Sequence, residues 1–406
     1  MERPPRYSAP FFCAYFFYYA GYCVFSSFIV LYLTQRGMSA TLCGVITSLS
    51  LLANLLMEPV GRYATDTLLS TRSYLLLCAG LICGLCLLST ALSSSPLLCV
   101  ALLILEAGLS YPFSQLMDAW VDGSRALDPN LSYTRVRAGG SMGFAAASAA
   151  AGCYFQRFGW SAYFLLQAGL FLAMAPFLLA LPRLELGNRK RAGKARDWLS
   201  PAGAFSVLLH SPRYLLCLLL CTTYWFSHRP VGSYLSLIIQ DRSGDAGAFG
   251  AVCAVGAVVE CASLLGLAAL QRRAGRRQPL GLLLGSALAT DVLRPLCMCL
   301  LPGIWPLYLG QGLQSVSFAL YYSASVECFS RAADQRIRSF SISMGLTASS
   351  VAGTVAANLA GGWLCDLAGS WALVHLSLGV SVANCLLLLL CFRRLFPAGG
   401  EERAGC

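Results

Sequence analysis

The stretch PFFCAYFFYYAGYCVFSSFIVLYL, residues 10–33, contains no charged side chain. An α-helix rises 1.5 Å per residue, so about 20 apolar residues are needed to cross the ~30 Å hydrocarbon layer of a bilayer. This stretch is long enough, and it lacks the alternation that is typical of a membrane β-strand. We therefore predict that residues 10–33 form a membrane-spanning helix.

The composition of the whole chain agrees with this prediction. Of its 406 residues, 57% are hydrophobic and 12% are charged, whereas a soluble domain has about 25% charged residues. These values exclude a soluble enzyme, a nucleic-acid-binding protein built on basic patches and a small disulfide scaffold. We predict an all-α membrane protein with twelve transmembrane helices, at residues 10–33, 40–61, 73–92, 96–121, 136–155, 160–181, 213–239, 247–270, 279–299, 303–327, 339–362 and 371–392.

The positions of Lys and Arg predict the orientation, because cytoplasmic loops retain basic residues. If the N-terminus is cytoplasmic, nearly all of the 29 basic residues lie on that side. The exceptions are Arg36, Arg157 and Arg242 in outer loops, and Arg229 and Arg294 within spans. We therefore expect both termini to be cytoplasmic. The short loops and termini favour a bacterial inner membrane.

A long polar stretch at residues 182–212 divides the predicted spans into two groups of six. We expect an N-terminal half at 1–181, a cytoplasmic linker at 182–212, and a C-terminal half with a short cytoplasmic tail at 213–406. Two six-helix halves related by a pseudo-twofold axis are a known arrangement in transporters.

The sequence offers little to a cofactor or a metal. The segment GNRKRAGKA, Gly187 to Ala195, has the wrong spacing for a phosphate-binding loop and ends on Ala where Ser or Thr would hold magnesium. Cys83 and Cys86 form a C-x-x-C pair inside an apolar span, and the chain has three His residues. We expect no cofactor, no metal and no enzymatic activity.

Ionisable residues inside the spans are the most informative feature, because a charge at mid-membrane costs about 2.5–3.5 kcal/mol even on the most lenient scale. Four of them are candidates for proton coupling: Glu260, Arg294, Asp291 and Glu106. Burial favours the protonated form of Glu260 and a nearby Arg favours the ionised form, so this acid could exchange a proton. Alternatively, Glu260 is permanently protonated, Asp291 and Arg294 form a local i, i+3 ion pair, and Glu106 pairs structurally.

Uncharged polar and aromatic residues in the spans are candidates for substrate binding. Tyr15, Tyr18 and Tyr22 form a stripe at i, i+3 and i+7 that reaches the middle of the first span, with Tyr19 one step round the helix, although helix packing alone could explain it. Tyr224 and His228 share one face of the seventh span, just before Pro230, which can kink the helix. The substrate candidates are Tyr15, Tyr18, Tyr19, Asn54, Gln115, Tyr224, His228, Gln311 and Gln314.

Three motifs resemble those of the major facilitator superfamily. PVGRYATDTLLSTR, residues 59–72, resembles its G-x-x-x-D-R-x-G-R-R loop, with Asp66 and Arg72 as the acidic and basic members. MDAWVDGSRALDPNLSYTRVRAGGSMGFAAASAAAG, residues 117–152, resembles the Y-G-R-V-R-x-W-G-S-I-G-F pattern of the phenylpropionate permease and nucleoside–proton symporter branch. LGQGLQSVSFAL, residues 309–320, resembles the Q-x-L-H-x-x-S-F-G motif of that branch, with Gln314 in place of the His.

The resemblance implies alternating access and proton symport. It places Glu260 where the branch has an acid on the eighth helix, and Arg294 where it has an Arg on the ninth. It also implies gating or structural roles at the inner ends of spans for Asp66, Arg72, Asp118, Arg135, Arg137 and Glu327.

We therefore predict a secondary active transporter that takes up a small polar or aromatic solute, such as a sugar, nucleoside or aromatic acid, together with a proton. Its expected partners are this solute, the proton and the lipid bilayer, with no nucleic acid, and we expect a monomer. Two alternatives remain open, namely a drug or metabolite efflux antiporter and a transporter-like ligand receptor.

Overall fold

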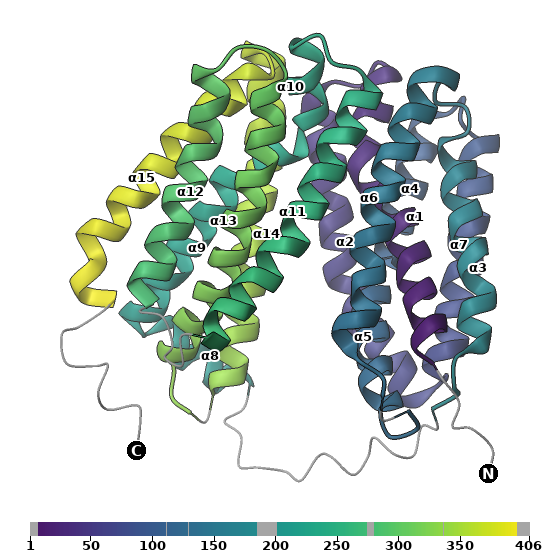
Figure 1. Cartoon of the computed structure of the whole chain (residues 1–406), viewed down its shortest axis with the longest axis horizontal. Helices are drawn as coiled ribbons and strands as arrows, with labels where there is room; N and C mark the ends of the chain where they lie inside the picture. The colour runs from purple at the N-terminus through teal and green to yellow at the C-terminus, as the bar shows by residue number, and fades with distance from the viewer. Residues whose placement is uncertain are drawn as a thin grey trace. The chain divides into compact units, whose positions relative to one another are not determined.

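The computed structural model describes residues 7–110, 112–128, 130–184, 201–273, 280–335 and 337–395. Every regular element in these ranges is an α-helix (Figure 1). Each of the twelve predicted spans coincides with a helix or with two consecutive helices, so the all-α prediction is confirmed. The basic segment Gly187–Ala195 lies outside the described residues.

The chain forms two compact units, and the boundary between them runs through one helix. Unit 1 contains the first seven helices and the first part of α11 (Ala246–Arg273), up to Val258. Its other helices are α1 (Ser8–Gln35), α2 (Ala40–Thr67), α3 (Thr71–Ala91), α4 (Pro96–Ser110), α5 (Pro112–Ser124), α6 (Tyr133–Phe158) and α7 (Tyr163–Ala180).

Unit 2 contains the rest of α11 and the remaining helices. These are α8 (Pro201–Leu209), α9 (Pro212–Ser233), α10 (Leu235–Asp241), α12 (Leu280–Leu300), α13 (Trp305–Arg331), α14 (Arg338–Ala368) and α15 (Trp371–Leu395). Helix α8 lies within the stretch 182–212, which we predicted as a polar linker. Its sequence PAGAFSVLL is apolar and helix-compatible, so the polar part of that stretch is shorter than predicted.

Nine helices of the described ranges are long and apolar enough to cross a membrane by length and composition. Among these nine, helices α4 and α5 together form one candidate span, Pro96–Ser124. The predicted spans at 136–155, 213–239 and 303–327 form α6, α9 with α10, and α13, but they are more polar than this criterion allows. Two of these spans carry the polar candidates His228 and Gln311, and the third, α6, contains several Gly and Ser residues.

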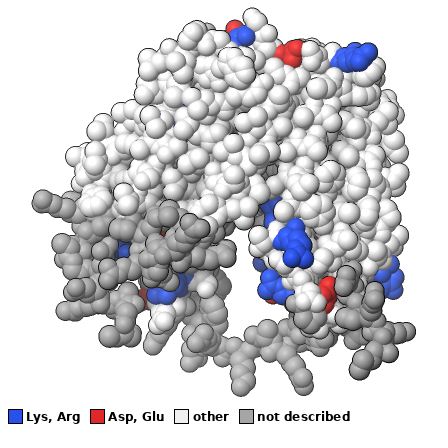
Figure 2. Space-filling view, in the orientation of Figure 1, with Lys and Arg blue, Asp and Glu red and all other residues white. Residues whose placement is uncertain are grey.

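Charged side chains are sparse on the helix flanks. In the face shown in Figure 2, Lys, Arg, Asp and Glu gather at the upper edge and in the lower part of the view. Large apolar side chains such as Leu56, Leu97 and Leu390 are exposed, at 70%, 79% and 83%. Apolar flanks of this kind are expected of helices that face lipid.

Glycines allow α1 and α6 to pack closely in unit 1. A Cβ atom built at Gly139 would collide with the carbonyl oxygen of Phe12, and one at Gly143 would collide with that of Phe16. The i, i+4 spacing of the two glycines on α6 matches the spacing of the two phenylalanines on α1. This is the small-residue packing that membrane helices use for close approach.

The first part of α11 packs on α6 in a similar way. A Cβ atom at Gly152 would collide with the carbonyl oxygen of Ala246, and one at Gly250 would collide with that of Ser148. The ring of Phe249 also meets Phe28 of α1 edge to face, with centroids 5.0 Å apart. These contacts explain why the start of α11 groups with unit 1.

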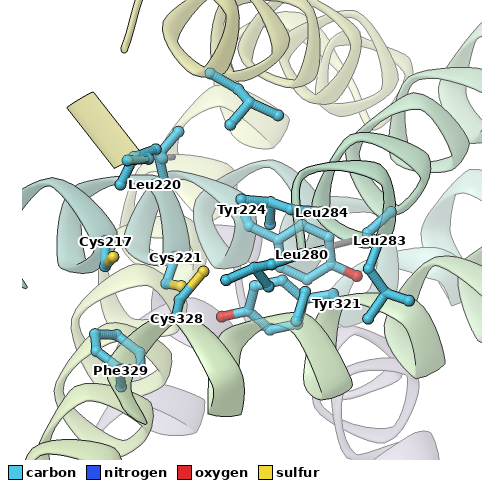
Figure 3. Close-up of a cluster of buried hydrophobic side chains, with 14 of the residues drawn as sticks. Cys217, Leu220, Cys221, Tyr224, Leu280, Leu283, Leu284, Tyr321, Cys328 and Phe329 are labelled. Atoms are coloured by element: carbon cyan, nitrogen blue, oxygen red, sulfur yellow. The ribbon is translucent and has the colours of Figure 1, made fainter. Parts of the chain in front are cut away.

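Helices α9, α12 and α13 enclose an apolar core in unit 2. Figure 3 shows the rings of Tyr224 and Tyr321 lying over one another beside Leu280, Leu283 and Leu284. The two ring centroids are 3.7 Å apart and the rings are inclined by 9°. This core fixes the register of the three helices that carry His228, Asp291, Arg294 and Gln311.

Candidate functional site

Asp291 of α12 is 1% exposed and accepts hydrogen bonds from three side chains of two other helices. From α9, Ser227 Oγ lies 2.7 Å from Oδ2 and His228 Nδ1 lies 3.1 Å from Oδ1. From α15, Ser381 Oγ lies 2.8 Å from Oδ2. Because a buried carboxylate is stable only when it is well hydrogen-bonded or paired, these donors explain how Asp291 persists in an apolar helix.

Arg294 lies one turn beyond Asp291 and is completely buried. Its Nη1 donates to the carbonyl oxygen of His228 at 3.0 Å, and its Nη2 donates to Oε1 of Gln311 on α13 at 3.2 Å. Its Nε has no hydrogen-bond partner in the part of the chain that the structure describes. The structure therefore brings four candidates from three helices together, and we call these residues with the two serines the Asp291 network: Ser227, His228, Asp291, Arg294, Gln311 and Ser381.

Tyr224 extends this network along α9. Its ring stacks on His228 with centroids 5.1 Å apart, and its hydroxyl group lies 3.1 Å from Ser317 Oγ of α13. Gln314 also lies on α13 and is half-buried, and its Oε1 has no hydrogen-bond partner among the described residues. Both substrate candidates are thus in unit 2, with Tyr224 adjacent to the Asp291 network.

Glu260 of α11 is half-buried and belongs to unit 2. Arg294 forms no ion pair within the described ranges, with Glu260 or with Asp291. Arg229, next to His228, is exposed, and its guanidinium lies 4.8 Å from the ring centroid of Trp225. Among the described residues, the hydrogen-bond acceptors of Arg294 are therefore neutral oxygens.

A second polar cluster lies in unit 1, where α1, α5 and α6 meet. Tyr15 Oη donates to Oδ1 of Asp118 at 2.5 Å, and Arg137 Nη2 donates to Oη of Tyr19 at 2.7 Å. The Arg137 guanidinium lies 4.3 Å from the ring centroid of Tyr19, which is cation–π geometry. The structure thus joins two predicted substrate residues to two predicted gating residues, and we call these four residues the tyrosine cluster.

Tyr18 and Glu106 have hydrogen-bond partners outside the tyrosine cluster, although the Tyr18 ring packs edge to face on Tyr19 with centroids 4.8 Å apart. Tyr18 Oη donates to the carbonyl oxygen of Ser110 at 3.1 Å, and the Tyr18 ring stacks on Phe113. Glu106 is completely buried and accepts a hydrogen bond from Nε2 of Gln167 on α7. Neither residue shares a hydrogen bond with the tyrosine cluster in the described part of the chain.

A polar pocket of about 470 Å³ opens between α2 and α5 of unit 1. Within it, Arg62 Nη2 bridges Glu58 Oε1 at 2.8 Å and Gln115 Oε1 at 2.9 Å. The pocket is lined by Glu58, Arg62, Thr65, Asp66, Pro112, Gln115, Leu116 and Ala119. The pocket is therefore lined by one substrate candidate, Gln115, and one gating candidate, Asp66. Asn54 lies one turn before Glu58 on α2 and is half-buried.

The other gating candidates lie near helix ends. Arg72 Nη1 donates to the carbonyl oxygen of Leu181 at 3.3 Å, which ties the start of α3 to the end of α7. Glu327 accepts from Arg331 one turn later on α13, with a distance of 2.8 Å. Arg135 is exposed at the start of α6.

Sequence reasoning missed the small polar residues that complete these clusters. Ser227, Ser381 and Gln167 are all buried and bond to candidate acids. Single Ser and Gln residues are common in apolar helices, and only the register between helices shows which of them face an acid. For metals, the described residues contain no group of three His, Cys, Asp or Glu side chains that could hold an ion.

Comparison with known proteins gives one family and several structural neighbours. The model of the MFS_1 like family matches residues 11–374. A search of curated protein sequences found no match.

The structural neighbours share the fold at low sequence identity. A mutant of the nucleoside transporter NupG has a TM-score of 0.81 and 13% identity, over 96% of this chain and 100% of that chain. The POT family transporter PepTSo has a TM-score of 0.70 and 11% identity, over 96% and 99%. A POT family transporter in complex with 5-aminolevulinic acid has a TM-score of 0.68 and 15% identity, over 97% of each.

Proposed function

Since the chain belongs to the MFS_1 like family of membrane transporters, we propose that it couples uptake of a small polar or aromatic solute to the entry of a proton. The resemblance to the major facilitator superfamily, the helical transporter fold and the expectation of a transporter rather than an enzyme are confirmed. The chain is an integral multi-pass membrane protein.

The observation that supports proton coupling best is the Asp291 network. Asp291 and Arg294 are both buried, at 1% and 0% exposure, yet no hydrogen bond or ion pair joins them in the described ranges. A charged group in such a place is costly, so charged residues inside membrane proteins usually have a function. We propose that Glu260 carries the proton and that Arg294 responds to its charge, with Asp291 holding the arginine's helix in place.

For the solute, we propose that the aromatic and amide side chains of the two units supply the contacts. These are Tyr15, Tyr18, Tyr19, Asn54 and Gln115 in unit 1, and Tyr224, His228, Gln311 and Gln314 in unit 2. Aromatic rings and amides suit a sugar, a nucleoside or an aromatic acid. The nucleoside transporter fold of one neighbour is compatible with this range.

We further propose alternating access between two halves, at residues 1–181 and 213–406, joined by a cytoplasmic linker. Gating would involve Asp66, Arg72, Asp118, Arg135, Arg137 and Glu327. The protein would act as a monomer in a bacterial inner membrane, with both termini in the cytoplasm.

The test of this function begins with a thermal-shift screen of sugars, nucleosides and aromatic acids, followed by uptake of the hits into proteoliposomes under an imposed pH gradient. Inward accumulation that collapses with the gradient supports the symporter. Movement of solute against the direction of proton flow would indicate an efflux antiporter, and binding without transport would indicate a receptor.

Two variants test the proposed residues in the same assay. Glu260→Gln should abolish accumulation driven by the gradient and retain solute exchange, because the amide cannot carry the proton. Arg294→Lys should lose most uptake, since the ammonium lacks the planar fork of donors. Normal accumulation by Glu260→Gln would show that another group carries the proton.

A further inference from the structure

Glu106 of α4 and Gln167 of α7 form a buried pair in which one hydrogen bond is made and two oxygens lack a donor among the described residues. Both side chains have 0% exposure. Gln167 Nε2 donates to Glu106 Oε1. The two remaining oxygens, Glu106 Oε2 and Gln167 Oε1, are both buried and have no hydrogen-bond partner among the described residues.

The number of donors and acceptors decides how this pair can be satisfied. The amide oxygen of Gln167 is only an acceptor, and so is each oxygen of an ionised carboxylate. Two acceptors cannot bond to one another, so an ionised Glu106 would leave Gln167 Oε1 without a donor, and for its own second oxygen only the weak thiol donor of Cys86 lies nearby. A protonated Glu106 has an O–H group at Oε2, which can donate to Gln167 Oε1. One proton therefore satisfies both oxygens at once.

Among the described residues, the groups that act on Glu106 carry no positive charge that would stabilise its ionised form. The titratable groups that act on it are thiols and a phenol, namely Cys83 and Cys86 on α3, Cys99 on α4 and Tyr163 on α7. No Lys, Arg or His forms an ion pair with Glu106 in the described part of the chain. An isolated buried carboxylate is very costly, and such a group becomes neutral instead.

Two of these neighbours already use their hydrogen atoms elsewhere. Tyr163 Oη donates to the carbonyl oxygen of Phe25 at 3.1 Å, and Cys83 Sγ donates to that of Ala168 at 3.4 Å. The remaining thiols are weak donors. The proton on Glu106 itself is therefore the strongest donor available to Gln167 Oε1.

We propose that Glu106 stays protonated and forms a two-bond acid–amide clasp with Gln167. In this clasp the amide N–H donates to one carboxyl oxygen and the carboxyl O–H donates to the amide oxygen, so that α4 and α7 are held together without a net charge. It follows that Glu106 is a positioning residue of unit 1 and does not carry the coupling proton. The clasp depends only on contacts within unit 1, so it stands or falls independently of the proposed transport function.

Infrared spectroscopy of the purified protein tests the protonation state directly. The wild type should show the carbonyl stretch of a protonated carboxyl group at neutral and mildly alkaline pH, and this band should be absent from Glu106→Gln. Glu260→Gln should retain the band. A Glu106→Gln difference spectrum that instead shows an ionised carboxylate at neutral pH would overturn the proposal.

A double-mutant cycle tests the two hydrogen bonds. Glu106→Gln keeps one donor and one acceptor facing Gln167, so its melting temperature should stay within about 2 °C of the wild type. Glu106→Leu and Gln167→Leu should each lower it by several degrees, because each leaves buried polar atoms unpaired. The double Leu variant should lose much less than the sum, since both partners are then apolar. Additive losses would contradict the clasp.

A transport measurement distinguishes a structural role of Glu106 from a role as proton carrier. Once a solute is known, Glu106→Gln should accumulate it under a pH gradient as the wild type does, whereas a carrier would lose accumulation with an unchanged melting temperature. Asp122→Leu serves as the control, because Asp122 bonds to Arg125 and its side chain is 77% exposed. Its melting temperature should change little.

Discussion

Asp291 and Arg294 in unit 2 are sealed from solvent, whereas Asp118 and Arg137 in unit 1 are only half-buried. In the Asp291 network, the acid is surrounded by serine and histidine donors from two other helices. In the tyrosine cluster, the acid and the arginine each bond to a tyrosine hydroxyl. Unit 2 therefore stabilises Asp291 and Arg294 by hydrogen bonds that water cannot replace, whereas water can partly replace those of Asp118 and Arg137 in unit 1.

The largest effect is expected from removing the acid of unit 2. Asp291→Ala would leave His228, Ser227 and Ser381 without their buried acceptor, so we expect a loss of about 3–5 kcal/mol in the free energy of unfolding. Thermal or denaturant unfolding in detergent measures it. Asp122→Ala is the control, because that side chain is 77% exposed beside Arg125 and should have no measurable effect. Equal losses in the two variants would remove the distinction between sealed and exposed acids.

A smaller effect is expected from the arginine of unit 1. Arg137→Gln removes a charge-assisted hydrogen bond and the cation–π contact with Tyr19, and we expect a loss of about 1–3 kcal/mol in unfolding free energy. Arg135→Gln, two residues earlier and exposed, should change stability little. If Arg137→Gln destabilised the protein as much as Asp291→Ala, the half-buried cluster would be as dependent on its charge as the sealed one.

The smallest loss of stability is expected from removing a single hydrogen-bond donor. Ser381→Ala removes one of three donors to Asp291 and should lower the unfolding free energy by about 1 kcal/mol. Ser350→Ala should be neutral, because the half-buried Ser350 donates to the carbonyl oxygen of Thr347 in its own helix, a bond that water can replace. A neutral Ser381→Ala would mean that the remaining two donors suffice.

The sequence predicted the helices well because long apolar runs leave few alternatives in a membrane. It also predicted that Asp291 and Arg294 share a face of one helix, since an i, i+3 spacing depends on that helix alone. It could not predict that Ser381 reaches Asp291, because this depends on the rotation of α15 against α12. For the same reason, the hydrogen bond between Tyr19 and Arg137 was missed, and the two residues were assigned to separate roles.

Helix α8, which lies where we predicted a polar linker, escaped prediction for another reason. Residues 182–212 were treated as one stretch because basic residues dominate its first half. Its second half, PAGAFSVLL, is apolar, and proline is well tolerated in the first turn of a helix. Averaging over the stretch therefore concealed a short helix.

The crossing of α1 and α6 limits how unit 1 can be re-engineered. Backbone meets backbone at Gly139 and Gly143, so even one added methyl group would force the two helices apart and displace Tyr15 and Tyr19 with them. Any redesign of unit 1 should therefore keep glycine at both positions, since the backbone contact at this crossing sets where the tyrosines of α1 lie.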